Sequence, residues 1–341
     1  MATIETKALD SIIASRRAML IGGGAVLAAL ATTSSAKAAS TVTAYTDADI
    51  LNFALNLEYL EANYYYLAAF GITIDAPPNK ASTAAGASQL LITGTGTQGG
   101  PVLVKANPQI PFKSVAVGSY AVETAVEEGK HVAFLRDALG VSGAIAQPQI
   151  DLLGAWNTLA MAAGIGATFD PFASDATFLI GAYVFEDVGV TAYHGAAPLI
   201  STTPAGKKIL GAAVGIHAVE AYHAGLVRTT LNFLDPDGAL GLIGLTQKIS
   251  ALRTTLAQAA STTLVTSDDI PLTPTTAPTM VMLNGASASA TSIVDADPVT
   301  VLGFARTTTQ VLNIVTGGGA TTAGVKATGV FFPAGLNGLF S

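Results

Sequence analysis

Two glutamate–histidine pairs, each with a spacing of three residues, have the side chains best suited to metal chemistry. They are Glu128 with His131 and Glu220 with His223, and both lie in stretches whose apolar spacing predicts helices. Residues three apart share one helix face, so each pair directs a carboxylate and an imidazole to the same side. Two further predicted helices each carry one glutamate on the apolar stripe, and four such helices supply the ligands of a carboxylate-bridged dimetal centre. The six candidate ligands are Glu58, Glu128, His131, Glu186, Glu220 and His223.

Buried carboxylates in such numbers predict bound cations, because an unpaired charge in an apolar interior costs several kcal/mol. Two divalent ions would balance four carboxylates, and carboxylate and imidazole ligands suit iron and manganese. The expected cofactor is therefore two divalent ions, Fe or Mn. The expected ligands are Glu58, Glu128 and His131 for one ion, and Glu186, Glu220 and His223 for the other. Glu128 and Glu220 are the candidate bridges.

Other polar residues of these helices are expected to play lesser roles. Glu61 lies about 60° from Glu58 on the helix and could support a ligand. Tyr65 shares the stripe of Glu58 and could hydrogen-bond a ligand, with a plain core position as the alternative. Glu123 and Glu127 are expected at the surface.

Two alternatives to this metal site remain open. The acids could instead face solvent or form ion pairs with Lys130, Arg136 and Arg228. His194 and His217 fit no ligand register, and we expect structural or supporting roles for them, with a separate metal site as the alternative.

The helices that must position these residues follow from the 3.6-residue apolar period and from capping signals. The four long ones are predicted at 47–71, 114–139, 174–200 and 203–233. Shorter helices are expected around Trp156, over 242–259 and after the cap Thr307-x-x-Gln310. Residues 72–114, rich in Gly, Pro, Thr and Ser, predict a long loop with a short hairpin.

The first 38 residues predict an export signal rather than part of the fold. Arg16 and Arg17 precede an apolar run, and Ala36-Lys37-Ala38 is a cleavage signal of the Ala-x-Ala type. Twin arginines before such a run predict a twin-arginine signal and a periplasmic or secreted protein. A membrane anchor that is not cleaved is the alternative.

The composition of the chain limits the classes of binding partner that we expect. The formal charge is −7, and it becomes −9 without the signal, whose four basic and two acidic residues are removed. Nucleic acid is therefore not an expected partner. Charged residues are only 11% of the chain, against roughly 25% in typical soluble proteins. The bland surface leaves a homo-oligomer or envelope association open, while the interrupted apolar stretch 152–169 predicts no transmembrane span after signal cleavage.

Longer segments around the candidate ligands resemble a ferritin-like family that includes plant desiccation-related proteins. They read LNLEYLEANYY in the first predicted helix, EEGKHVAFLR in the second, FEDVGVTAYHGAA in the third and VEAYHAGLVR in the fourth. The tail segments ARTTTQVLNIV and FFPAGLNG resemble the same family. The resemblance implies an all-α, ferritin-like four-helix bundle over 39–259, with a long 72–114 insertion. The apolar residues of the Thr-, Ala- and Gly-rich tail, 260–341, predict an irregular C-terminal wrap packed on the bundle, for which disorder is the alternative.

A ferritin-like fold does not choose a reaction, and no catalytic residue is predicted. The first hypothesis is a redox metalloprotein of the envelope whose substrate is a small oxidant, oxygen or peroxide, or a metal ion, and which acts in stress protection. The second is a structural or desiccation-protective protein in which metal is a staple or is absent.

Overall fold

A computed structural model describes residues 45–76, 89–261, 268–274, 293–297, 300–319 and 326–340. All of them belong to one compact unit, Tyr45–Ser341. The predicted export signal at residues 1–38 lies outside the described residues.

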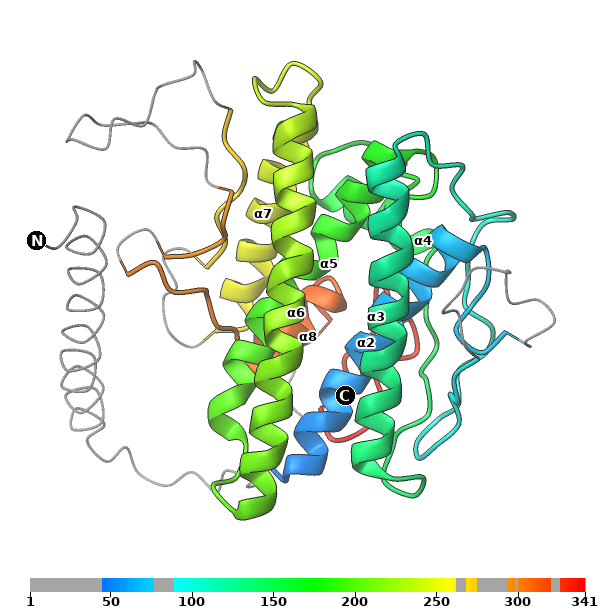
Figure 1. The fold of residues 1–341 in the computed structure, drawn as a ribbon, viewed down its shortest axis with the longest axis vertical. Coiled ribbons are helices and arrows are strands. Elements are labelled where there is room, and N and C mark those ends of the chain that lie inside the picture. Colours follow the sequence, from blue (N-terminus) through cyan, green and yellow to red (C-terminus); the bar gives the residue numbers. More distant parts are fainter. Residues whose placement is uncertain are drawn as a thin grey trace, which may run out of the picture. The chain divides into compact units, whose positions relative to one another are not determined.

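Four long helices form the bundle: α2 (Asp47–Phe70), α3 (Val115–Leu139), α5 (Asp175–Ala196) and α6 (Pro204–Leu234). α2 packs along α3, and α5 packs along α6 (Figure 1). α3 and α6 run in opposite directions, as the colour order in Figure 1 shows. The described residues contain helices and no strands, so the predicted all-α class is confirmed.

The ends of these helices are set by local signals that the sequence contains. Thr46 and Asp49 form a capping box at the start of α2, and Gly71, with φ of 71°, ends it in the left-handed region that favours glycine. The Thr203 side chain caps α6, and Pro204 occupies its first turn, where no backbone N–H is needed.

A second layer covers the α2 and α5 side of the bundle. It contains α4 (Gly154–Ala162), α7 (Leu242–Ala259) and α8 (Thr308–Val315), and the short 3-10 helix η1 (Ala197–Leu199) joins α5 to α6. α7 packs on α8 and on α5. The Phe331 ring lies 5.1 Å from Trp156 and 5.0 Å from Phe185, centroid to centroid, so this part of the tail is anchored in the core.

The predicted hairpin is wrong for the described part of the insertion, 72–76 and 89–114. This stretch makes isolated parallel bridges instead, from Thr95 to Ile145 and from Leu103 to Asp151. Several of its backbone groups hydrogen-bond to residues 144–152, because that segment runs alongside it. No return strand of its own is needed.

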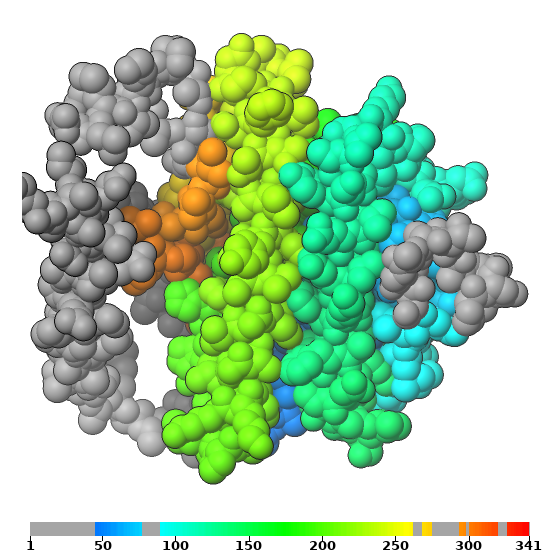
Figure 2. All heavy atoms as spheres, in the orientation of Figure 1, coloured from blue at the N-terminus to red at the C-terminus, as the bar shows by residue number. Residues whose placement is uncertain are grey.

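α6 is the one helix in the described residues that is long and apolar enough to cross a membrane by length and composition. Only 22% of its most apolar window is buried. α6 and α3 lie side by side on the face drawn in Figure 2, and residues of both line shared surface grooves.

Candidate metal centre

The six candidate ligands converge inside the bundle. α2 contributes Glu58, α5 contributes Glu186, and α3 and α6 contribute the two glutamate–histidine pairs. All six side chains are buried, with the four glutamates between 0 and 1% exposed. The apolar stripes dictate this burial, since each glutamate occupies a position that would otherwise hold a core residue.

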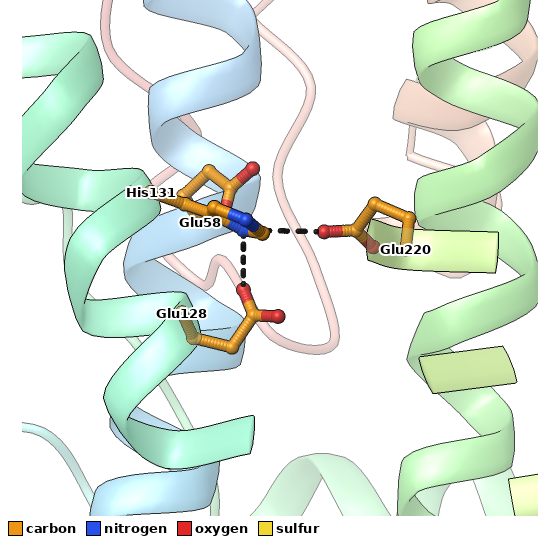
Figure 3. Close-up of side chains that lie close together, drawn as sticks. All are labelled: Glu58, Glu128, His131 and Glu220. Carbon is orange, nitrogen blue, oxygen red and sulfur yellow. Dashed lines mark ion pairs between the residues drawn. The ribbon is translucent and has the colours of Figure 1, made fainter. Parts of the chain in front are cut away.

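His131 is surrounded by three carboxylates from three helices. Its Nδ1 lies 3.3 Å from a Glu58 oxygen. Oxygens of Glu128 and Glu220 each lie 3.5 Å from the same nitrogen. Figure 3 shows the imidazole between Glu128 on its own helix and Glu220 on α6.

His223 is the centre of a second group. Its Nδ1 lies 3.0 Å from Glu128 Oε1 and 3.5 Å from Glu186 Oε2. Glu128 therefore belongs to both groups, as a bridging carboxylate would. Both groups place one potential ligand atom from each residue within 4.8 Å of the others, close enough to hold a metal ion.

The position of Glu220 differs from the expected assignment. It faces His131, whereas the sequence assigned it to the metal of His223. The cause is the opposite direction of α3 and α6 (Figure 1), which places the glutamate of each pair beside the histidine of the other. Sequence spacing alone does not contain that direction.

Buried polar atoms without hydrogen-bond partners are concentrated at this centre. An unsatisfied buried polar atom costs about 1–3 kcal/mol, and more when it is charged. Those in the six residues are Glu58 Oε2, both oxygens of Glu128, His131 Nδ1, Glu186 Oε2, both oxygens of Glu220 and His223 Nδ1. Such a set of inward oxygen and nitrogen donors fits divalent cations, which would satisfy all of them together.

Glu127 orients one of the histidines. Its Oε2 lies 2.8 Å from His223 Nε2, although its side chain is 37% exposed. A proton on Nε2, donated to Glu127, leaves Nδ1 free to bind a metal. Glu127 thus lies at the surface as expected, and it also contacts His223, a role that the sequence did not assign. Glu123 is exposed as expected.

Two tyrosines tie α2 and α5 together in a reciprocal way. Tyr65 of α2 donates a hydrogen bond to Glu186 of α5, and Tyr193 of α5 donates one to Glu58 of α2. Tyr65 thus contacts a candidate ligand, as predicted. Tyr193 was not assigned a role, although it follows Glu186 by seven residues just as Tyr65 follows Glu58. That repeated spacing could have identified it.

Glu61 and Gly189 complete the wall of the centre on the α2 and α5 side. Glu61 is buried, and the charges of Glu220 and Glu128 act on it, after burial itself, to raise its pKa well above the usual value. A Cβ at Gly189 would overlap Glu220 Oε2 and would lie 3.6 Å from Glu61 Oε1. A glycine at position 189 therefore leaves the space that the Glu220 carboxylate occupies.

The electrostatics of the centre reflect burial and crowding. Burial raises the pKa of Glu58 to about 7 and raises that of Glu220 well above its usual value. Burial opposes ionisation of Glu128 as well, but the two imidazoles together lower its pKa. Burial disfavours the charged form of each imidazole, yet the surrounding carboxylates raise the pKa of both His131 and His223. Metal binding at such a cluster releases protons, because the ligand atoms must be deprotonated.

The arginines named as alternative partners lie elsewhere. Arg136 donates to the Tyr59 hydroxyl and to the carbonyl of Thr93, and Arg228 forms an ion pair with Asp187. His194 and His217 form a separate contact with ring centroids 6.0 Å apart. His194 Nδ1 lies 3.0 Å from the carbonyl oxygen of Phe304, which suits a structural role.

A helical bundle with inward carboxylates and imidazoles on four helices defines the ferritin-like class. The chain belongs to the ferritin-like domain family, whose model matches residues 46–232, so the predicted resemblance is confirmed. A curated relative, desiccation-related protein PCC13-62 of Craterostigma plantagineum, is 31% identical over 223 residues. The alignment covers 62% of each chain, so the present chain spans less than two thirds of that relative. No solved structure matches the present chain at a significant level.

Proposed function

We propose that this protein is an exported metalloprotein that holds two divalent ions, Fe or Mn, and reacts with dioxygen or peroxide in stress protection. The observation that carries the proposal is the set of buried carboxylate and imidazole atoms without hydrogen-bond partners. When bound, such ions supply redox chemistry and open coordination positions. Export through the twin-arginine signal is part of the proposal and rests on the sequence of residues 1–38.

The chain's own residues would position and protect the site. The four glutamates and two histidines would hold the ions, with Glu128 between them. Glu127 would keep the His223 Nδ1 atom unprotonated, and the two tyrosines would hold Glu58 and Glu186 in place by hydrogen bonds. The apolar residues that surround the cluster would exclude bulk water and strengthen its electrostatic interactions.

The proposal is tested by the metal content of the exported protein, measured by plasma mass spectrometry. We expect about two Fe or Mn ions per chain, because the two ligand groups share Glu128. The double variant Glu128→Ala/His131→Ala should lose both, whereas Glu123→Gln, an exposed change on the same helix, should keep them. Protein without metal in the wild type as well would contradict the proposal.

A second candidate is a non-catalytic protective protein in which metal is only a staple. It is favoured by the relative's name, which associates that protein with desiccation. Consumption of peroxide or oxidation of Fe(II) by the loaded protein separates the two candidates. A loss of thermal stability on chelation without any turnover would favour the staple.

A further inference from the structure

An apolar cavity lies between the bundle and the layer that covers it. Its volume is about 60 Å³, and residues of α2, α4, α5, α7 and α8 line it together with Phe331. Its lining residues include none from α3 or α6. The cavity is therefore on the side of the bundle away from the groove between α3 and α6. Its apolar walls include Leu57, Leu60, Trp156, Phe185, Val188 and Ile249.

The cavity reaches the metal centre at one end. Glu61 and Gly189 both line it, and both also border Glu220. Because Gly189 has no side chain, its bare backbone and the carboxyl group of Glu61 form the wall nearest to Glu220. The far rim is made by half-buried residues such as Leu159 of α4 and Leu252 of α7. The cavity thus extends from the covering layer to the ligands.

The size and lining of the cavity select its occupant. About 60 Å³ is more than a water molecule needs and less than the roughly 150 Å³ of a dry engineered cavity that binds benzene or xenon. A polar molecule would find few partners, since Arg253 is engaged by Tyr183, Asp187 and Asp269. Of the other polar groups of the lining residues, Trp156 Nε1 is buried without an acceptor and the Glu61 carboxyl group lies at the end nearest to Glu220, while the remaining walls are apolar.

We propose that this cavity holds dioxygen and conducts it to the metal centre through the Glu61–Gly189 wall. The inference rests on the proposed function. Of the two oxidants proposed there, it assigns dioxygen to the path through this cavity. Hydrogen peroxide has two donors and several acceptor lone pairs. Removing such polar groups from water without new hydrogen bonds is unfavourable. Peroxide is therefore not expected to collect there.

The single tryptophan of the chain reports on the cavity directly. The indole N–H of Trp156 gives one resonance in a proton–nitrogen spectrum, and dissolved dioxygen is paramagnetic. In the metal-free full chain under oxygen pressure, we expect this proton to relax about threefold faster or more than equally buried amides, because close packing excludes oxygen elsewhere. The backbone amide of Val132, in α3, is a suitable reference.

Two matched variants sharpen the measurement. Ala160→Leu adds three carbon atoms at the cavity lining, and Ala162→Leu adds the same atoms to the exposed side of the same helix. Ala160→Leu should remove most of the oxygen effect at the indole, and Ala162→Leu should keep it. If Ala160→Leu does not fold, Val184→Ile, another lining residue enlarged by one methylene group, should reduce the effect in the same direction.

The proposal is overturned if the indole relaxes no faster than the reference amide, or if filling the cavity leaves the oxygen effect unchanged. These readouts need no metal, so they decide the cavity even if the protein proves to bind none. With loaded protein, Ala160→Leu should slow oxidation by dioxygen and leave the reaction with peroxide unchanged. Equal slowing of both reactions would contradict a separate oxygen route.

Discussion

Two clusters of buried charge lie next to each other in this protein, and adjacent residues of α5 belong to different ones. Glu186 faces the carboxylate–imidazole cluster, whereas Asp187 faces an arginine–aspartate cluster. Asp187 Oδ2 lies 2.9 Å from Arg228 Nη1 and 2.8 Å from Arg253 Nη2. Asp269 Oδ2 lies 2.7 Å from Arg253 Nε and 2.9 Å from Arg306 Nη2.

The two clusters differ in how their charges are neutralised. In the arginine–aspartate cluster, guanidinium groups supply permanent positive charge and bind the C-terminal segments to α5, α6 and α7. In the carboxylate–imidazole cluster the described residues supply no arginine or lysine partner, and many buried atoms lack hydrogen bonds. Buried charge that the protein satisfies by itself indicates a structural role. Buried charge whose atoms lack hydrogen bonds indicates a site for an added cation.

Removing an arginine should break the first cluster and test this distinction most strongly. Arg253→Met leaves Asp187 and Asp269 short of a partner in the interior, so we expect a loss of about 3–5 kcal/mol in the free energy of unfolding. Urea denaturation measures it. Lys248→Met, an exposed change on the same helix, should stay within about 0.5 kcal/mol of the wild type. A loss of that small size for Arg253→Met would contradict the structural role.

Removing a charge from the second cluster should have the opposite effect on the metal-free protein. Burial and neighbouring carboxylates raise the pKa of Glu220 well above its usual value, so a charged carboxylate at this position costs free energy in the metal-free fold. Glu220→Gln removes that cost and should stabilise the metal-free chain by about 1 kcal/mol. The same change should weaken metal binding by about 100-fold or more, since a ligand is lost. Isothermal titration and urea denaturation give the two values, and destabilisation of the metal-free form would contradict the comparison.

Glu127 offers a smaller change at the edge of the second cluster. Glu127→Gln still reaches His223 Nε2 but no longer supplies a carboxylate acceptor. We expect metal affinity to fall about 10- to 100-fold, as it does when an outer partner of a metal-binding histidine is changed. Glu123→Gln, one turn earlier on α3, should leave the affinity unchanged. An equal effect of the two substitutions would show that only the overall surface charge matters.

Asp295 provides the smallest test, in the first cluster. Burial raises its pKa from 3.8 to about 8, with Asp187 and Asp269 adding to the effect. An acid whose pKa rises on folding binds a proton in the native state, so its contribution to stability falls as pH rises from about 4 to about 8. Asp295→Asn should flatten this dependence by at least about 1 kcal/mol across that range, since each pKa unit corresponds to roughly 1.4 kcal/mol. Urea denaturation at several pH values measures it, and the exposed Asp137→Asn should leave the slope unchanged.

Much of the bundle could be predicted from local patterns. Apolar stripes, the Thr46 and Thr307 capping boxes and the glycine after Phe70 lie within single elements, and each helix has close to its predicted bounds. The convergence of Glu58 and Glu186 with the two pairs could be predicted for the same reason, since each glutamate interrupts an apolar stripe. For the described part of the loop the hairpin was wrong, because the bridges of that part reach a distant segment, 144–151.

The buried face of each helix follows from the sequence, because the 3.6-residue period and the caps are local properties. Which residues lie opposite each face depends on how the helices pack. The antiparallel course of α3 and α6 set Glu220 beside His131, the pairing of α2 with α5 joined Tyr193 to Glu58, and the bundle edge brought Glu127 to His223. These contacts join residues about 90 to 135 positions apart, and spacing along one helix contains no information about the direction or depth of its neighbour.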